Sequence, residues 1–240
     1  MKAFARTDIG KVRPINEDSY YLPAPGEEFC AVADGMGGHN AGEIASAMAI
    51  RVFTDEMRRS ELPMELAMRN AVEEANRVIH KAGQDTPDQS GMGTTFTALC
   101  QDSGLALIAH VGDSRAYLIR NGAIMRVTTD HTLVEEMVLQ GLITPQEAKY
   151  HPHRNFVTRA LGTMESVEVD ILSLEIQKGD LYLLCSDGLH GALEEKEILR
   201  CALSDKDYEA RLQDMIDIAL ERGGHDNITA LLVVCEEAAE

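Results

Sequence analysis

The sequence predicts an α+β fold in which many short strands are combined with helices that come in pairs. Apolar runs such as Leu105–Val111 and Leu181–Cys185 are too short for helices and are bounded by turn residues, which is typical of buried strands. Apolar residues at helical spacing recur in adjacent segments, as at 41–58 and 63–82. Asn121-Gly122 joins two further apolar runs and is a strong hairpin signal. No linker or repeat interrupts the chain, so we expect residues 1–240 to form a single domain.

The expected elements can be placed along the chain in order. Strands are predicted at 3–7, 18–22, 29–33, 94–100, 105–111, 116–120, 123–127, 167–176, 181–185 and 228–235. Long helices are predicted at 41–58, 63–82, 194–203 and 207–222. A more polar segment between them is expected to hold a short helix at 132–140 and another beginning at Thr144, where Thr144 and Glu147 have capping-box spacing.

Charge and cysteine usage narrow the classes of partner and compartment. With 40 Asp and Glu against 22 Lys and Arg, the formal charge is −18, which argues against nucleic acid or an anionic membrane as a partner. The five cysteines mostly sit inside apolar runs and lack CxxC spacing, which favours reduced, buried thiols in a cytoplasmic protein. No apolar stretch is long enough to cross a membrane.

Acidic residues stand at the ends of several predicted strands, each beside a glycine. These residues are Asp34, Asp113, Asp187 and Asp226. A carboxylate emerging from a hydrophobic strand is costly to desolvate unless a positive charge lies beside it. Oxygen-only ligation suits hard divalent cations such as Mg²⁺ or Mn²⁺. The pattern therefore predicts a carboxylate-lined metal cluster.

Eight short motifs occur in an order that identifies a family. They are RPINEDSYY (13–21), VADGMGGH (32–39), GTT (93–95), VGDSRAY (111–117), DHT (130–132), TRALG (158–162), CSDGL (185–189) and GGHDNIT (223–229). Together they resemble the metal-dependent, type 2C protein serine/threonine phosphatases in their compact bacterial form. Each motif alone is weak, but eight in order over residues 6–235 are very specific.

The resemblance implies an architecture and an activity. The architecture is two antiparallel β-sheets packed as a central sandwich and flanked by helix pairs, with a flap segment near 131–155. The activity is that of a metal-dependent phosphatase that hydrolyses phosphoserine and phosphothreonine monoesters and reverses serine/threonine kinase signalling. Phosphorylated proteins are the implied substrates and a serine/threonine kinase is the implied opposing partner. Nothing in the sequence resembles a coiled coil, so we expect a monomer.

The resemblance also assigns metal ligands. Asp34 would bridge two Mn²⁺ or Mg²⁺ ions, the Gly35 carbonyl would complete one, and Asp187 and Asp226 would complete the other. Asp113, with Asp187, corresponds to a weaker third site. Glu17 and Asp18 would contribute partly through water, because adjacent strand residues point to opposite faces.

Arg13 is the expected phosphate-binding residue, because a guanidinium can hold two phosphate oxygens at once. In the implied mechanism, hydroxide formed between the two ions attacks phosphorus in line, and no phosphoenzyme forms. Met36 stands where some eukaryotic relatives carry a histidine acid, and His39 follows three residues later. Leaving-group protonation is therefore assigned either to His39 or to a metal-bound water.

The flap contributes three further candidates, His151, His153 and Arg154, which are expected to lie at the surface and to contact substrate. The proline between the histidines and the absence of nearby cysteine favour surface residues over metal ligands. Rival chemistry based on a catalytic cysteine is excluded, because no cysteine is followed by arginine at the required six-residue spacing. Two alternatives remain: a phosphopeptide-binding pseudophosphatase, and a hydrolase of small phosphate esters.

Overall fold

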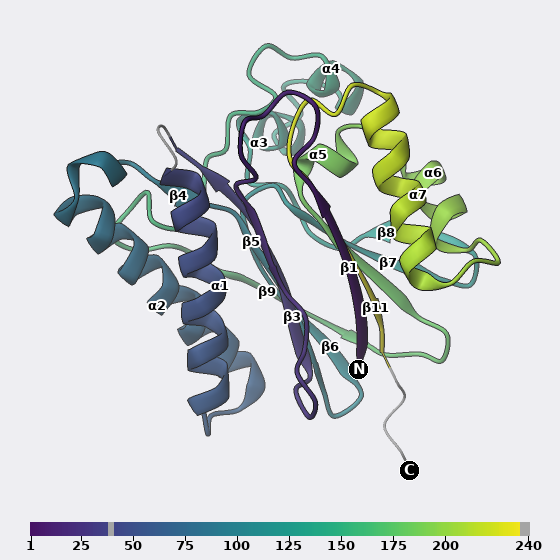
Figure 1. Cartoon of the computed structure of the whole chain (residues 1–240), viewed down its shortest axis with the longest axis horizontal. Helices are drawn as coiled ribbons and strands as arrows, with labels where there is room; N and C mark the ends of the chain where they lie inside the picture. The colour runs from purple at the N-terminus through teal and green to yellow at the C-terminus, as the bar shows by residue number, and fades with distance from the viewer. Residues whose placement is uncertain (38–40, 236–240) are drawn as a thin grey trace.

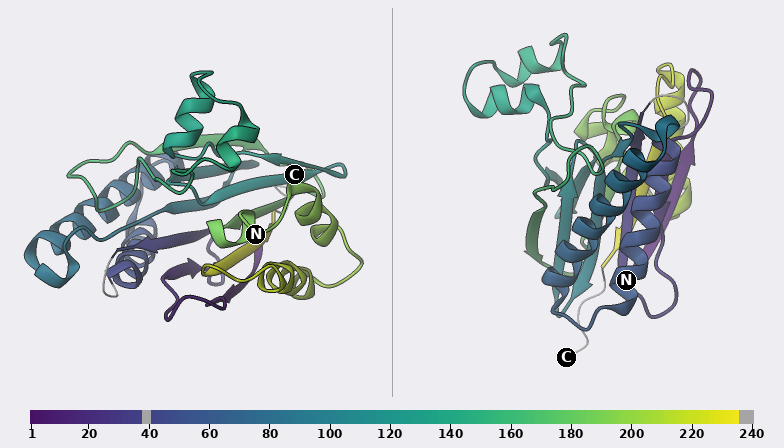
Figure 2. Two further views of the ribbon diagram at one scale, coloured as in Figure 1. Left: turned by 90° about the horizontal axis from the view of Figure 1, so that it is seen from above. Right: turned by 90° about the vertical axis from the view of Figure 1, so that its left-hand side faces the viewer.

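The computed structural model describes residues 1–37 and 41–235, in which two antiparallel sheets lie face to face (Figures 1 and 2). The first sheet has the order β1 (Lys2–Asp8), β11 (Ile228–Val234), β10 (Leu181–Cys185), β7 (Arg115–Arg120), β8 (Ala123–Arg126). The second has the order β2 (Asp18–Tyr21), β3 (Phe29–Met36), β5 (Phe96–Asp102), β6 (Leu105–Val111), β9 (Asp170–Glu175), and β4 (Gly93–Thr94) pairs with β3. The chain crosses between the sheets several times, so each sheet contains strands from both halves of the sequence.

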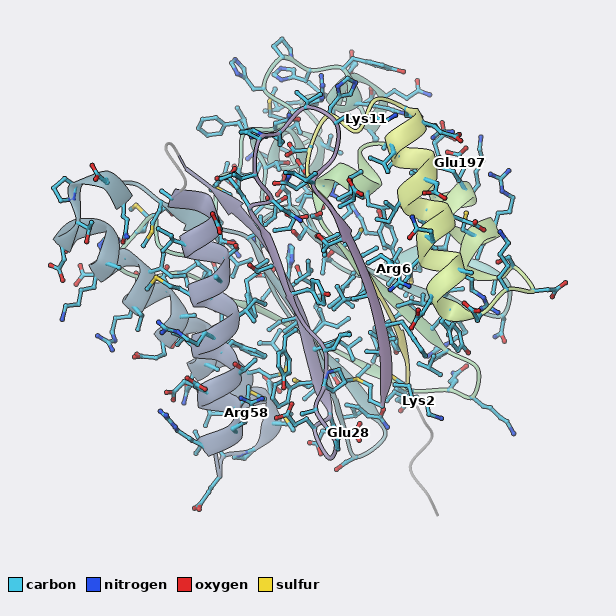
Figure 3. The ribbon with its side chains drawn as sticks, viewed as in Figure 1. Lys2, Arg6, Lys11, Glu28, Arg58 and Glu197 are labelled. Carbon is cyan, nitrogen blue, oxygen red and sulfur yellow. The ribbon has the colours of Figure 1, made fainter. Side chains whose placement is uncertain are left out.

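Helices cover the outer face of each sheet, which completes the layers expected from the sequence. The long helices α1 (Ala41–Arg59) and α2 (Met64–Asp85) lie against the second sheet, whereas α6 (Glu195–Ala202) and α7 (Tyr208–Glu221) lie against the first (Figure 1). Arg6 of β1 reaches α7, where its Nη2 lies 2.7 Å from Glu209 Oε2 (Figure 3). The shorter helices are η1 (Pro87–Gln89), α3 (Leu133–Leu139), α4 (Pro145–Lys149) and α5 (Asp187–His190).

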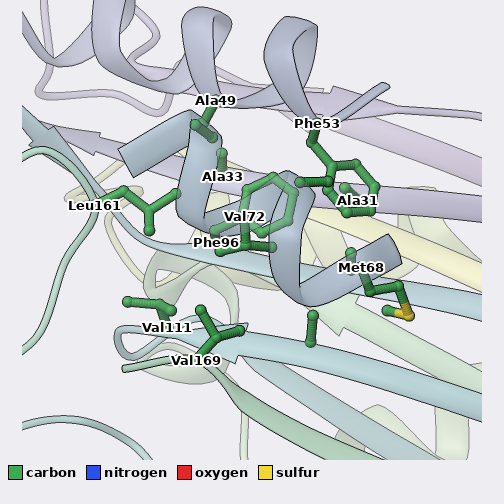
Figure 4. Packing of buried hydrophobic residues seen from close by; sticks show 14 of the residues in the cluster. Ala31, Ala33, Ala49, Phe53, Met68, Val72, Phe96, Val111, Leu161 and Val169 are labelled. Atoms are coloured by element: carbon green, nitrogen blue, oxygen red, sulfur yellow. The ribbon is translucent and has the colours of Figure 1, made fainter. Parts of the chain in front are cut away.

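Three apolar clusters hold these layers together, because alternate residues of each strand face opposite sides. Leu183 of β10 faces the helices, while Leu184 faces the other sheet. On the opposite side of the sandwich, Phe53 of α1 packs on Phe96 of β5 with ring centroids 4.9 Å apart (Figure 4). The two sheets are thus fixed relative to each other and to their helices, which positions every loop between them.

The observed elements confirm most of the expected ones and correct several boundaries. The hairpin turn has positive φ at both Asn121 (52°) and Gly122 (77°), the conformation that an Asn-Gly turn favours. The third strand is longer than expected: Asp34 does not follow it but lies within it, because β3 continues by pairing Gly35 with Thr94. The strand predicted at 167–176 is confined to 170–175, where it pairs with β6.

The flap at 131–155 rises from the end of the sandwich and carries α3 and α4 (Figure 2). Its base is closed by an isolated bridge between Thr132 and Val157. The capping box at α4 is confirmed: the Glu147 N–H donates to Thr144 Oγ1, and the Thr144 N–H donates to the Glu147 carboxylate at 2.8 Å. None of the described helices is both long and apolar enough to cross a membrane.

Candidate active site

Five aspartates from both sheets gather at one end of the sandwich. Asp18 and Asp34 are partners on the neighbouring strands β2 and β3. Asp113 follows β6, Asp187 follows β10, and Asp226 precedes β11. Burial raises the pKa of Asp34 well above its usual range, and the charges of the other four aspartates raise it further. The residues predicted as metal ligands are therefore brought together, although they span almost the whole chain.

Asp18 has one carboxylate oxygen with a hydrogen-bond partner and one without. Its Oδ2 accepts a hydrogen bond from Ser186 Oγ at 2.7 Å, whereas its Oδ1 is buried without a hydrogen-bond partner. Burial raises the pKa of Asp18 to about 7, and the charges of Asp187 and Asp226 add to this effect. An unpartnered buried carboxylate oxygen is costly, so its position favours a nearby cation.

Asp34 is held rigidly through its backbone. Its N–H donates to Thr95 Oγ1 at 3.0 Å, and its carbonyl accepts from Thr94 Oγ1 at 2.9 Å. Thr95 Oγ1 in turn lies 2.7 Å from Ser114 Oγ, which follows Asp113. These two hydroxyl groups link Asp34 of β3 to the turn that carries Asp113.

The charge of Asp187 acts on Asp113. Burial raises the pKa of Asp113 to about 7, and the charge of Asp187 is the next largest cause. Burial likewise raises the pKa of Asp187 to about 6. The charge of Asp226 also raises this pKa, whereas the charge of Arg13 lowers it. A carboxylate whose pKa is raised by a neighbouring carboxylate is suited to share a divalent cation with it.

Arg13 lies in the loop between β1 and β2 and supplies the positive charge of the cluster. Its Nη2 lies 2.8 Å from Asp226 Oδ2, and its Nη1 lies 3.9 Å from Glu17 Oε2. The hydrogen bond to Asp226 raises the pKa of Arg13. Burial raises the pKa of Glu17, whereas Arg13 opposes that shift. The side chain of Arg13 is 45% exposed, so it can reach an incoming anion.

Gly35 packs so tightly that no larger residue fits. A Cβ placed there would lie 2.1 Å from the carbonyl oxygen of Gly42 and 2.7 Å from that of Glu17. A Cβ on Gly42 would in turn lie 2.4 Å from Glu17 Oε1. The start of α1, the end of β3 and the segment before β2 are therefore in direct contact, which fixes Glu17 at the edge of the cluster.

Two motif residues contact the site although the sequence did not identify them as site residues, namely Ser186 and Asn227. Ser186 of the CSDGL motif binds Asp18, as described above. Asn227 of the GGHDNIT motif joins three segments: its Nδ2 donates to the carbonyls of Ile9 and Ile15, both at 2.9 Å, and its Oδ1 accepts from the Glu17 N–H at 2.8 Å. The signal for both was adjacency to a predicted ligand, since each stands next to one of the motif aspartates.

The flap candidates are not joined to the aspartates by any contact in the described part of the chain. His153 and Arg154 are exposed, and the rings of His151 and His153 are 5.7 Å apart. The Arg154 N–H donates to the His151 carbonyl at 3.1 Å. His151 is partly buried, and contact of the three flap residues with substrate stays a prediction. His39 lies outside the described residues.

The donor set fits a hard divalent cation, because it consists of carboxylate and backbone oxygens only. In the described ranges 1–37 and 41–235, no three His, Cys, Asp or Glu side chains converge closely enough to enclose an ion by themselves. Backbone carbonyls or water would complete the coordination of an ion held by these carboxylates. The unpartnered Asp18 Oδ1 is the specific feature that a cation or its water would satisfy.

Comparison with known proteins decides the family. The model of the family described as protein phosphatase 2C matches residues 14–233. The chain belongs to the protein phosphatase 2C family. A related serine/threonine phosphatase, stp from Listeria monocytogenes serovar 1/2a, is 38% identical over 240 residues, covering 97% of this chain and 95% of the relative.

Solved structures of protein phosphatase 2C relatives share the fold. The Staphylococcus aureus serine/threonine phosphatase Stp1 matches with a TM-score of 0.92 and 33% identity, over 98% of this chain and 96% of Stp1. The catalytic domain of the serine/threonine protein phosphatase PstP, solved with two manganese ions, matches with a TM-score of 0.87 and 37% identity, over 96% of each chain. The predicted α+β sandwich and the predicted metal-dependent serine/threonine protein phosphatase are therefore confirmed at the level of the family.

Proposed function

We propose that the clustered aspartates hold two Mn²⁺ or Mg²⁺ ions and that residues 1–240 act as one catalytic domain. Asp34 is the carboxylate on which the charges of all four other aspartates act, and it would be a ligand of both ions. The Gly35 carbonyl is assigned to one ion, and Asp187 and Asp226 to the other. Glu17 and Asp18 act at the edge of the cluster, partly through water. The observation that carries this proposal is the gathering of five aspartates at one end of the sandwich, with Asp18 Oδ1 buried and unpartnered.

When bound, two divalent ions supply a hydroxide nucleophile near neutral pH. Arg13 would leave Asp226 and hold two oxygens of the phosphoryl group, which orients phosphorus for in-line attack and stabilises the charge that develops. No cysteine or histidine nucleophile is required, so no phosphoenzyme forms. Ser186 and Thr95 fix Asp18 and Asp34 in position throughout. His39 stays a candidate for protonating the leaving group, and His151, His153 and Arg154 stay candidates for contact with the protein substrate.

Three finer assignments belong to the same proposal. A third, weaker ion would be held by Asp113 together with Asp187. The chain would act as a monomer on phosphorylated proteins, opposing a serine/threonine kinase. The five cysteines are all buried and free, which supports action in the reducing cytoplasm.

The experiment that tests the proposal is hydrolysis of a phosphothreonine peptide with and without added Mn²⁺. Wild-type protein should turn over only with the ion, and Asp187→Ala should lose that activity. Asp205→Ala is the matched control, because Asp205 is exposed in the loop between α6 and α7. Folded protein without turnover in any divalent ion would instead favour the pseudophosphatase. Turnover of nitrophenyl phosphate alone would favour a hydrolase of small esters.

A further inference from the structure

The short helix α5 carries Asp187 and also contacts the turn between β6 and β7, which contains Asp113 and is called the Asp113 turn below. Asp187 is its first residue and His190 its last. The Nε2 of His190 lies 2.9 Å from the backbone carbonyl oxygen of Asp113. A carbonyl only accepts hydrogen bonds, so His190 Nε2 carries the proton and is the donor. One helical turn therefore touches both aspartates assigned to the third ion.

The helix α5 is itself firmly placed. A Cβ on Gly188 would lie 2.0 Å from the Asn227 carbonyl oxygen, so α5 is in close contact with the loop that carries Asp226. The Gly191 N–H donates to the Asp187 carbonyl at 2.7 Å, and the buried Leu189 anchors the turn in the core. His190 thus reaches Asp113 from a rigid support.

The Asp113 turn is held from its other side by a second histidine. The Gly112 N–H donates to His131 Nδ1 at 3.0 Å, and the His131 N–H donates to the Gly112 carbonyl at 2.7 Å. Gly112 has a φ of 108°, and a Cβ there would lie 2.7 Å from Thr95, so this position of the turn requires glycine. Removing the His190 contact alone should therefore leave Gly112 in place and free only the backbone at Asp113.

We propose that His190 is a positioning residue that holds Asp113 at the spacing from Asp187 which the third divalent ion requires. The inference rests on the proposed third site. Asp113 and Asp187 repel each other, and the hydrogen bond from His190 to the Asp113 carbonyl opposes their separation. Buried hydrogen bonds to the residues that carry metal ligands commonly change metal affinity by about 10- to 100-fold. The Nε2 of His190 cannot bind the ion, because its proton is donated to the carbonyl of Asp113.

The test compares His190→Gln with His190→Asn in the full chain. The glutamine amide can reach the position of the imidazole Nε2, whereas the asparagine amide is too short. Mn²⁺ binding is measured directly, from the electron paramagnetic resonance signal of the free ion during titration. We expect His190→Asn to weaken the weakest Mn²⁺ site about tenfold and to leave the two tight sites unchanged. His190→Gln should retain most of the wild-type affinity at that site.

His80→Asn is the matched control. His80 also contacts a backbone carbonyl, with its Nδ1 3.0 Å from the oxygen of Gly162, but it lies on α2 away from the aspartates. Thermal unfolding in EDTA reports whether each variant is folded. Equal weak-site affinity in wild-type and His190→Asn, or equal losses in the glutamine and asparagine variants, would overturn the inference.

The Asp113→Asn variant distinguishes a failure of the role assigned to His190 from a failure of the proposed third metal site. If that variant loses the weak ion while His190→Asn binds it normally, the third site stands and the role of His190 is wrong. If Asp113→Asn keeps the weak ion, the third site lies elsewhere and both assignments fail.

Discussion

Asp18 and Asp34 lie directly opposite each other on β2 and β3, so two carboxylates form one cross-strand pair. Like charges in opposed positions destabilise a sheet. Replacing Asp18 by Asn removes one charge but keeps an oxygen to accept the hydrogen bond from Ser186. We therefore expect Asp18→Asn to stabilise the metal-free protein by about 1 kcal/mol.

The same substitution should lower Mn²⁺-dependent activity by about 10- to 100-fold, because the site loses an anionic oxygen. Urea unfolding in EDTA and peptide hydrolysis in Mn²⁺ measure the two effects. Asp205→Asn provides the exposed control. A metal-free variant less stable than wild type would show that repulsion between the strands is not the dominant effect.

Stabilisation by Mn²⁺ should grow as the pH rises from about 5 to about 7.5. The pKa values of Asp18 and Asp113 are about 7 and that of Asp187 is about 6, all above the unfolded value of about 3.9. Without the ion, the folded chain retains protons that the unfolded chain has released, so this contribution to the free energy of unfolding falls as the pH rises. Ion binding requires the deprotonated carboxylates and is favoured over the same range.

The measurement is the difference between unfolding midpoints with Mn²⁺ and with EDTA at each pH. Buried histidines, whose lowered pKa values act in the opposite direction, contribute with and without the ion and so cancel in this difference. A difference that stays constant across the range would mean that the raised pKa values do not belong to the metal-binding carboxylates.

Arg13→Lys should weaken substrate binding without weakening metal binding. A lysine ammonium can neutralise Asp226 but cannot hold two phosphate oxygens in the fixed geometry of a guanidinium. We expect KM for a phosphothreonine peptide to rise about tenfold, which corresponds to about 1.4 kcal/mol. Lys11→Ala is the control, because Lys11 is an exposed cation of the same loop (Figure 3). An unchanged KM would remove Arg13 from phosphate binding.

Asn227→Asp should be strongly destabilising although it is nearly isosteric. The carboxylate cannot donate to the carbonyls of Ile9 and Ile15, and it places a further negative charge beside Asp226. Loss of two buried hydrogen bonds costs about 2 to 4 kcal/mol. Chemical denaturation gives the value, and Asn70→Asp on the exposed face of α2 is the control. A loss equal to that of the control would mean that the three segments are held by other contacts.

Local patterns were sufficient to predict most strands, the paired helices and the Asn121-Gly122 hairpin, because each depends on residues close in sequence. The end of β3 was not predictable in this way: its extension past Asp34 depends on pairing with Thr94, some sixty residues later. The one-turn helix α5 is too short to show helical periodicity. Motifs identified the five aspartates, but the partners of Ser186 and Asn227 lie on distant segments that only the packed sheets bring together.

The pairing of β1 with β11 also sets the order in which the enzyme can form. Lys2 pairs with Val234, and the loop after β1 is tied through Lys11 to Gly224. During synthesis, β1 has no strand to pair with until β11 has been made, because β11 is its neighbour in the sheet. Arg13 therefore cannot take its place beside Asp226 until the chain has been synthesised as far as β11, so the active site is completed by the last strand of the fold.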